Sequence, residues 1–129
     1  MTGMNRAPAL LQFLLIGPAL LVAAQAWSAD AARGQELYES RCGACHSLDD
    51  NRVGPAHKGV VGRKAGTAAD YDYSPAVKTS TIVWNVDTLD RWLTDPERTI
   101  PGQKMGYSVP LEQDRSDIIA YLAKVSAHP

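Results

Sequence analysis

The chain has 129 residues, and its 13 lysines and arginines are balanced by 14 aspartates and glutamates to a formal net charge of −1. This length leaves room for one domain. Because Arg6 is the only charged residue before Asp30, the rest of the chain is close to neutral, and it contains no block of basic residues. This charge pattern argues against nucleic acid as a partner.

Residues 1–26 are predicted to be a secretory signal peptide. An apolar run over residues 7–24 follows Arg6, and the small-residue sequence Ala24-Gln25-Ala26 fits a cleavage site. The run covers about 18 residues, which is near the lower limit for a spanning helix, so an uncleaved membrane anchor is the alternative. We therefore expect one exported domain over residues 27–129.

A first helix is predicted over residues 31–41, with Asp30 as its N-cap. Gly34, Leu37 and Tyr38 fall on one side of this helix at helical spacing. A glycine on that side lets another helix approach closely. We expect this face to pack on a partner helix.

The first helix runs into Cys42-Gly43-Ala44-Cys45-His46, the pattern for covalent attachment of a c-type haem. Two thiols at this spacing can add to the two vinyl groups of one porphyrin, and the imidazole that follows can then reach the iron. These are the only cysteines in the chain. A thioredoxin-like redox pair would need alternating strands and helices, and a zinc site would need further ligands; neither is visible. We predict one covalent haem c on Cys42 and Cys45, with His46 as an iron ligand. Because c-type haem is attached outside the bacterial inner membrane, we expect a periplasmic protein, held at that membrane if residues 1–26 are kept.

Residues 47–81 are predicted to be mostly loop, because glycine and proline recur throughout. Long loops in a small domain are usually functional or wrapped around something, and here the porphyrin would be the object. Ser74-Pro75 could start one short helix, with the serine as its cap. No strand-like alternation and no internal repeat is visible.

Two further helices are predicted in the last third of the chain. Asn85 is a plausible cap for a helix over residues 86–94, which Pro96 closes. The last helix begins near Pro110-Leu111 and has one apolar face at positions i, i+3, i+4 and i+7. We expect this face to meet the Gly34 side of the first helix. Its residues are Ile118, Tyr121, Leu122 and Val125.

Met105 is the candidate for the second iron ligand. Met1 and Met4 would leave with the signal peptide, and Met105 lies in a loop with Pro101, Gly102 and Gly106 around it. A lone methionine is ordinarily core filler, but proline and glycine on both sides argue against a helix core position. The competing ligands are two histidines that we expect to be exposed or hydrogen-bonded, His57, only 11 residues after His46, and His128 near the end of the chain.

With these motifs in order, the chain resembles a class I cytochrome c of the mitochondrial type and its bacterial periplasmic relatives. The resemblance covers residues 33–125. It is carried by Gly34 with Tyr38, Cys42-Gly43-Ala44-Cys45-His46, Val53-Gly54-Pro55, Gly59-Val60-Val61-Gly62-Arg63-Lys64-Ala65-Gly66, Tyr71-Asp72-Tyr73-Ser74, Trp84 with Asp87-Thr88-Leu89, Pro101-Gly102-Gln103-Lys104-Met105 and Asp117-Ile118-Ile119-Ala120-Tyr121-Leu122.

The resemblance implies an all-α fold, the cytochrome c fold, in which helices and loops enclose one covalent haem and the first and last helices cross. It also implies that the Pro55 carbonyl accepts from the far nitrogen of His46 and fixes that ring. Arg63, Tyr73 and Trp84 would approach the haem propionates, where buried negative charge needs donors.

Three residues depart from the pattern of the family. Gln103 stands where a threonine usually helps to hold a propionate, and Val77 where an asparagine often orders internal water. Trp92 stands where a tyrosine usually hydrogen-bonds the methionine sulfur, so its indole is expected at the haem. The ring of basic residues around the haem edge is also thin, so docking to a strongly acidic partner does not follow. The remaining basic residues are Arg41, Lys58, Lys64 and Lys104, with Asp95 and Glu97 close by.

The implied function is one-electron transfer by a monomeric carrier that is not an enzyme. Its partners would be a membrane quinol-oxidising complex, a terminal oxidase or a periplasmic dehydrogenase. One alternative is a dedicated electron-accepting subunit of a periplasmic dehydrogenase. A second is a ligand-binding or peroxidatic haem protein, which would require Met105 to leave the iron.

Overall fold

The computed structural model describes residues 1–3 and 28–127. The predicted signal peptide therefore lies outside the described residues apart from its first three positions. The described part folds into α1 (Ala31–Arg41), α2 (Pro75–Lys78), α3 (Val86–Thr94), α4 (Pro96–Thr99) and α5 (Glu112–Ser126). Its only β-pairing is one isolated bridge between Lys64 and Val83, which agrees with the expected all-α fold. No helix in the described ranges is both long and apolar enough to cross a membrane.

The side-chain caps expected from the sequence are present at three helices. The carboxylate of Asp30 accepts from the backbone N–H groups of Ala32 and Arg33 at the start of α1. Ser74 caps α2, whose first residue is proline. Asn85 caps α3 in a reciprocal capping box with Thr88. These caps satisfy backbone donors that have no partner inside the helix.

Two helix boundaries differ from the prediction. Pro96 was expected only to close the preceding helix, but α3 ends at Thr94 and Pro96 then opens α4, with the Asp95 side chain as cap. Aspartate followed by proline suits a helix start as well as a helix stop, since proline needs no N–H partner in the first turn. The last helix begins at Glu112, where Leu111 provides no side-chain cap.

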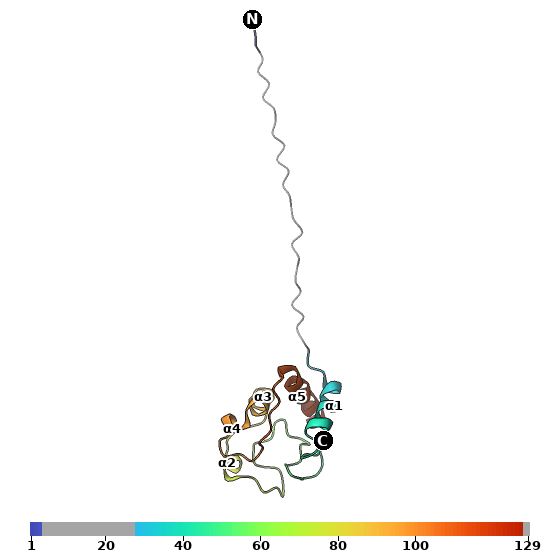
Figure 1. Ribbon diagram of the computed structural model, residues 1–129, viewed down its shortest axis with the longest axis vertical. Helices are drawn as coiled ribbons and strands as arrows, with labels where there is room; N and C mark the ends of the chain where they lie inside the picture. The colour runs from blue at the N-terminus through green and yellow to red at the C-terminus, as the bar shows by residue number, and fades with distance from the viewer. Residues whose placement is uncertain (4–27, 128–129) are drawn as a thin grey trace.

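The first and last helices cross, as expected, with Gly34 at their contact. In Figure 1, α1 and α5 lie side by side, while α2 and α4 lie at the opposite side of the molecule. A Cβ atom on Gly34 would overlap the backbone of α5, with the carbonyl carbon of Asp117 only 2.5 Å away. Glycine is therefore required for this close approach.

Buried carboxylates on α5 fasten it to α1. Arg33 lies 2.5 Å from carboxylate oxygens of both Asp114 and Asp117, and Arg41 lies 2.9 Å from Asp114. The two aspartates are each 1% exposed. Burial alone would raise the pKa of Asp117, but hydrogen bonds from the Asp30 backbone N–H, Arg33 and Gln113 hold it below its ordinary value. The Asp117 carboxylate therefore stays charged, and both buried carboxylates stabilise the crossing only while their partners are in place.

One hydrophobic core lies beneath these helices and receives side chains from the long loops. Arg115, also buried, closes one edge of it by donating to Asp90 of α3 and to the carbonyl oxygens of Val109 and Pro110. The buried apolar residues are Tyr38, Val60, Ala65, Val77, Trp84, Leu89, Leu93, Ile100, Val109, Ile118, Ile119, Tyr121 and Leu122.

Candidate haem-binding site

The cysteine motif forms a tight turn directly after α1. The backbone N–H of His46 donates to the carbonyl of Cys42 at 2.8 Å, and the Cys45 carbonyl accepts from Gly54 at 2.8 Å. Arg52 donates to the carbonyl of Gly43 at 2.6 Å. The loop over residues 52–54 therefore holds the motif in position.

The two thiols lie in different environments. Cys42 is half-buried and packs against the core, whereas Cys45 is exposed. Burial raises the pKa of the Cys42 thiol to about 11. Because the thiolate is the reactive form, Cys42 is a poor nucleophile once the chain has folded.

His46 is buried, and its ring is oriented from two directions. Its Nδ1 lies 2.9 Å from the Pro55 carbonyl, which is the contact that the resemblance implied. A Cβ on Gly54 would lie 2.6 Å from Nε2 of the ring, so only glycine fits there. Burial lowers the pKa of His46, although the Pro55 hydrogen bond opposes the shift. The imidazole is therefore neutral, and with Nδ1 used by Pro55, Nε2 is the nitrogen available to a metal.

His57 lies beside His46, a contact that sequence reasoning did not foresee. The two imidazole rings are stacked, with centroids 4.0 Å apart and planes 20° apart. Nδ1 of His57 is 3.0 Å from the hydroxyl of Tyr38. Loss of hydration, then the neighbouring His46 and Arg63, hold the pKa of His57 well below its ordinary value. The only hint in the sequence was the short separation of the two histidines.

Backbone pairing brings Arg63 and Trp84 together. The N–H of Trp84 donates to the carbonyl of Arg63 at 2.9 Å, and the carbonyl of Trp84 accepts from Gly62 at 2.7 Å. The buried Trp84 ring contacts the Trp92 ring, with centroids 5.4 Å apart. Three residues named from the sequence therefore form one cluster.

Tyr73 lies on the neighbouring loop, half-buried against the core. Its hydroxyl oxygen accepts from the backbone N–H of Ala68 at 3.0 Å, and its ring packs edge-on against Tyr71, with centroids 4.7 Å apart. Since its oxygen accepts in that bond, the Tyr73 O–H remains able to donate to another acceptor.

Met105 lies in the segment between α4 and α5 and packs, half-buried, against the core. The segment is fixed at both ends. Near its start, Glu97 accepts from the Gly102 N–H at 3.0 Å, and at its end Val109 donates to the carbonyl of Leu93 at 2.7 Å. The sulfur therefore belongs to a held loop and not to a helix core.

The residues present fit a covalent haem. In the part of the chain that the structure describes, Nε of Arg63 and Oε1 of Gln103 are buried side-chain atoms without a hydrogen-bond partner. The Arg63 N–H suits a propionate carboxylate, which needs a buried donor. The Gln103 amide nitrogen is already used, because it donates to the Glu97 carboxylate at 3.2 Å. The chemistry of the remaining donors, two thiols and one neutral oriented imidazole, also matches the group.

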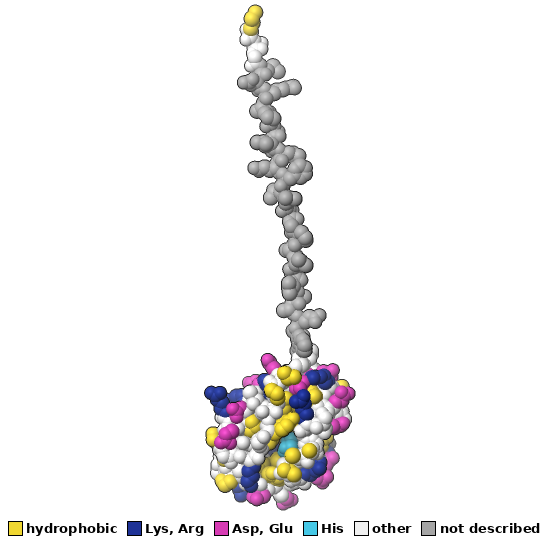
Figure 2. All heavy atoms as spheres, in the orientation of Figure 1, with side chains coloured by type: hydrophobic (Ala, Val, Ile, Leu, Met, Phe, Trp, Pro, Cys, Tyr) yellow, Lys and Arg dark blue, Asp and Glu magenta, His cyan; other side chains and the backbone are white. Residues whose placement is uncertain are grey.

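One face of the molecule carries many apolar side chains around a histidine (Figure 2). Figure 2 shows apolar side chains gathered around a recess with a histidine side chain at its floor, while charged side chains lie mainly around the edge. An apolar recess with a few polar groups at its floor is typical of a cofactor site.

Comparisons with known proteins identify the family of the chain. The family model described as Cytochrome c matches residues 31–126. The chain belongs to the cytochrome c family. Cytochrome c of Euglena viridis is 46% identical over 96 residues, which cover 72% of this chain and 94% of that protein. Cytochrome c2 of Rhodomicrobium vannielii is 36% identical over 118 residues, which cover 88% and 94%.

A solved structure has the same architecture as this chain. Cytochrome cH from Methylobacterium extorquens superimposes with a TM-score of 0.71 at 43% identity, covering 74% of this chain and 98% of that one. The cytochrome c fold expected from the sequence is therefore confirmed. Membership of the family makes the chain an electron carrier that binds one covalent haem c, with redox proteins as its partners.

Proposed function

We propose that this cytochrome c is a one-electron carrier whose iron is bound by His46 Nε2 on one side and by the Met105 sulfur on the other. The observation that carries the proposal is the buried, neutral His46 imidazole, whose Nδ1 is 2.9 Å from the Pro55 carbonyl. That hydrogen bond fixes the ring and increases its strength as a donor. Met105 supports the proposal because both ends of its loop are held.

When bound, the haem would accept and release one electron, and ligation by histidine and methionine raises its reduction potential. The chain binds and orients the group through Cys42, Cys45 and the two ligands. Trp84 and Trp92, whose rings are in contact, would exclude water from the haem, and Arg63 would offer its free N–H to a propionate. Tyr73 offers its hydroxyl in the same way. With both axial positions filled, no site remains for a substrate, so we propose a carrier and not an enzyme.

We further propose that residues 1–26 direct export and are removed, which leaves a soluble monomeric domain over residues 27–129 in the periplasm. Its partners would be a membrane quinol-oxidising complex, a terminal oxidase or a periplasmic dehydrogenase. Asp95 and Glu97 are the acidic residues expected to weaken docking to an acidic partner. Both also have internal roles: Asp95 caps α4, and Glu97 accepts a hydrogen bond from the Gly102 N–H. A mature protein that still begins at Met1 would instead support an anchored carrier.

The first experiment is an absorption spectrum of the purified mature protein, oxidised and reduced. Ferric haem bound by methionine sulfur has a weak near-infrared charge-transfer band. We expect the band in the parent protein, its loss in Met105→Ala and its retention in the control Lys104→Ala. If the band is missing and the reduced protein binds carbon monoxide readily, the sixth position is open and a ligand-binding or peroxidatic haem replaces the carrier. Copurification with one dehydrogenase would indicate a dedicated subunit.

A further inference from the structure

The contact between His57 and His46 has no role in the function described so far. The Pro55 carbonyl and the backbone of Gly54 already restrain the His46 ring, although the torsion about the Cβ–Cγ bond is intrinsically broad for histidine. A ring stacked at 4.0 Å with a 20° angle between planes opposes that rotation, because the His46 ring would have to push it aside. His57 therefore adds a restraint on the plane of the His46 ring to the restraints from Pro55 and Gly54.

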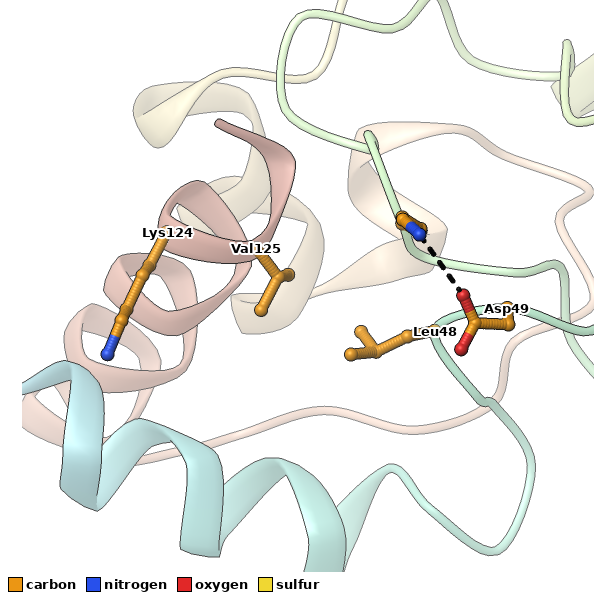
Figure 3. A pocket seen from close by; sticks show the side chains of 5 residues that line it. Leu48, Asp49, Lys124 and Val125 are labelled. Carbon is orange, nitrogen blue, oxygen red and sulfur yellow. Dashed lines mark ion pairs between the residues drawn. The ribbon is translucent and has the colours of Figure 1, made fainter. Parts of the chain in front are cut away.

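The backbone of His57 is tied to the haem motif. Its N–H donates to the Ser47 carbonyl at 3.0 Å, and the next N–H, that of Lys58, donates to the Leu48 carbonyl at 2.8 Å. Figure 3 shows the ion pair that continues this pairing, between Asp49 and Lys58, 3.5 Å apart, beside Leu48. The segment that carries His57 therefore keeps its register with the segment that follows His46.

The side chain of His57 is held from the opposite direction by the helix crossing. Tyr38 of α1 is only 4% exposed, and its hydroxyl oxygen lies 3.0 Å from Nδ1 of His57. The Tyr38 ring in turn packs against Tyr121 of α5, with centroids 5.5 Å apart. Tyr38 both meets His57 Nδ1 and packs against the His57 ring, with centroids 5.6 Å apart, so the orientation of that ring depends on α1 and, through Tyr121, on α5.

We infer that His57, held by Tyr38, is a positioning residue that fixes the plane of the His46 ring at the iron. This inference rests on the proposed ligation by His46. The plane of an axial imidazole decides how its π orbital overlaps with the iron d orbitals, so it sets the distribution of unpaired spin over the four haem methyl groups in the ferric state. A residue with a merely structural role would lower stability without moving that distribution.

The test compares Tyr38→Phe and His57→Leu with Tyr121→Phe in the ferric mature holoprotein. Tyr38→Phe keeps every ring and removes the hydrogen bond to His57, while His57→Leu removes the stacked ring itself. Tyr121→Phe is the matched control, because it deletes a hydroxyl from a ring that packs on Tyr38 and leaves the bond to His57 intact. Proton NMR measures the haem methyl shifts, and voltammetry measures the reduction potential.

We expect both test variants to redistribute the haem methyl shifts and to move the reduction potential relative to the parent, and the control to leave both unchanged. The inference is overturned if the haem methyl shifts of Tyr38→Phe are the same as those of Tyr121→Phe. This comparison does not require His57→Leu to fold. Failure of the proposed ligation is distinguishable, because the parent protein itself would then lack the near-infrared methionine band.

Discussion

Replacing Gly34 by alanine tests the helix crossing on which the fold depends. The added Cβ would lie 2.5 Å from the carbonyl carbon of Asp117 and 3.1 Å from the amide nitrogen of Ile118. Nonbonded carbons prefer a separation of about 3.5 Å or more, so the two helices must move apart by about 1 Å at this point. Backbone atoms on both sides leave no side chain that could turn away.

The expected cost follows from two opposing contributions. Alanine is better than glycine inside a helix by about 1 kcal/mol. Overpacking costs about 1–3 kcal/mol and more where nothing can yield, and the same movement stretches both Arg33 ion pairs to α5. We expect a net loss of about 2 kcal/mol in the free energy of unfolding. For a domain of this size that lowers the melting temperature by about 8–16 °C.

The assay is thermal unfolding of the ferric mature holoprotein, followed by far-ultraviolet circular dichroism. Glu36→Ala is the control, because Glu36 is exposed on the opposite side of the same helix. It should melt close to the parent. A Gly34→Ala protein that melts with the control would refute the close approach of α1 and α5.

Three further changes test the site and the buried charges. Gly54→Ala would place a methyl group against the His46 ring and break its bond to Pro55, so we expect little holoprotein with a normal absorption spectrum; a normal yield would contradict the geometry. Arg63→Gln removes a positive charge beside the proposed propionates and should lower the reduction potential, whereas Lys58→Gln removes an exposed charge and should change it less; equal shifts would argue against a propionate contact. The pKa of the Asp117 carboxyl is lowered in the folded state, so its stabilising effect is present above the ordinary value of about 3.9 and is lost as pH falls through the folded value. Asp117→Asn should therefore reduce the loss of unfolding free energy as pH falls below the ordinary value, which acid titrations of stability can measure; an unchanged loss would contradict the buried ion pairs.

Local signals predicted the starts of α1, α2 and α3 well because each of these starts depends on its own residues. Asp30, Ser74 and Asn85 accept from N–H groups two or three positions onward, and a contact of that range is readable from a short stretch. The same locality explains the missed helix α4, since the proline that ends α3 also begins α4. Sequence alone could not decide between stop and restart.

Contacts between distant segments could be predicted only where a motif marks them. The Pro55 carbonyl near His46 followed from the resemblance, whereas the stack of His57 on His46 depends on how two loops pair, which no motif recorded. The buried aspartates of α5 were likewise missed. Their partner Arg33 lies more than 80 positions away, and a charged residue in an amphipathic pattern reads as solvent-exposed.

The helix crossing also bears on when the haem can be attached. It joins Arg33 to Asp117, 84 positions further along the chain. In the proposed export the chain would present Cys42 and Cys45 outside the membrane before α5 follows, and a contact of such long range forms only after both segments are available. In that interval Cys42 has not yet been buried, so its thiol keeps ordinary reactivity. Because α5 supplies part of the core against which Cys42 packs, attachment of the haem to Cys42 is expected to precede the docking of α5.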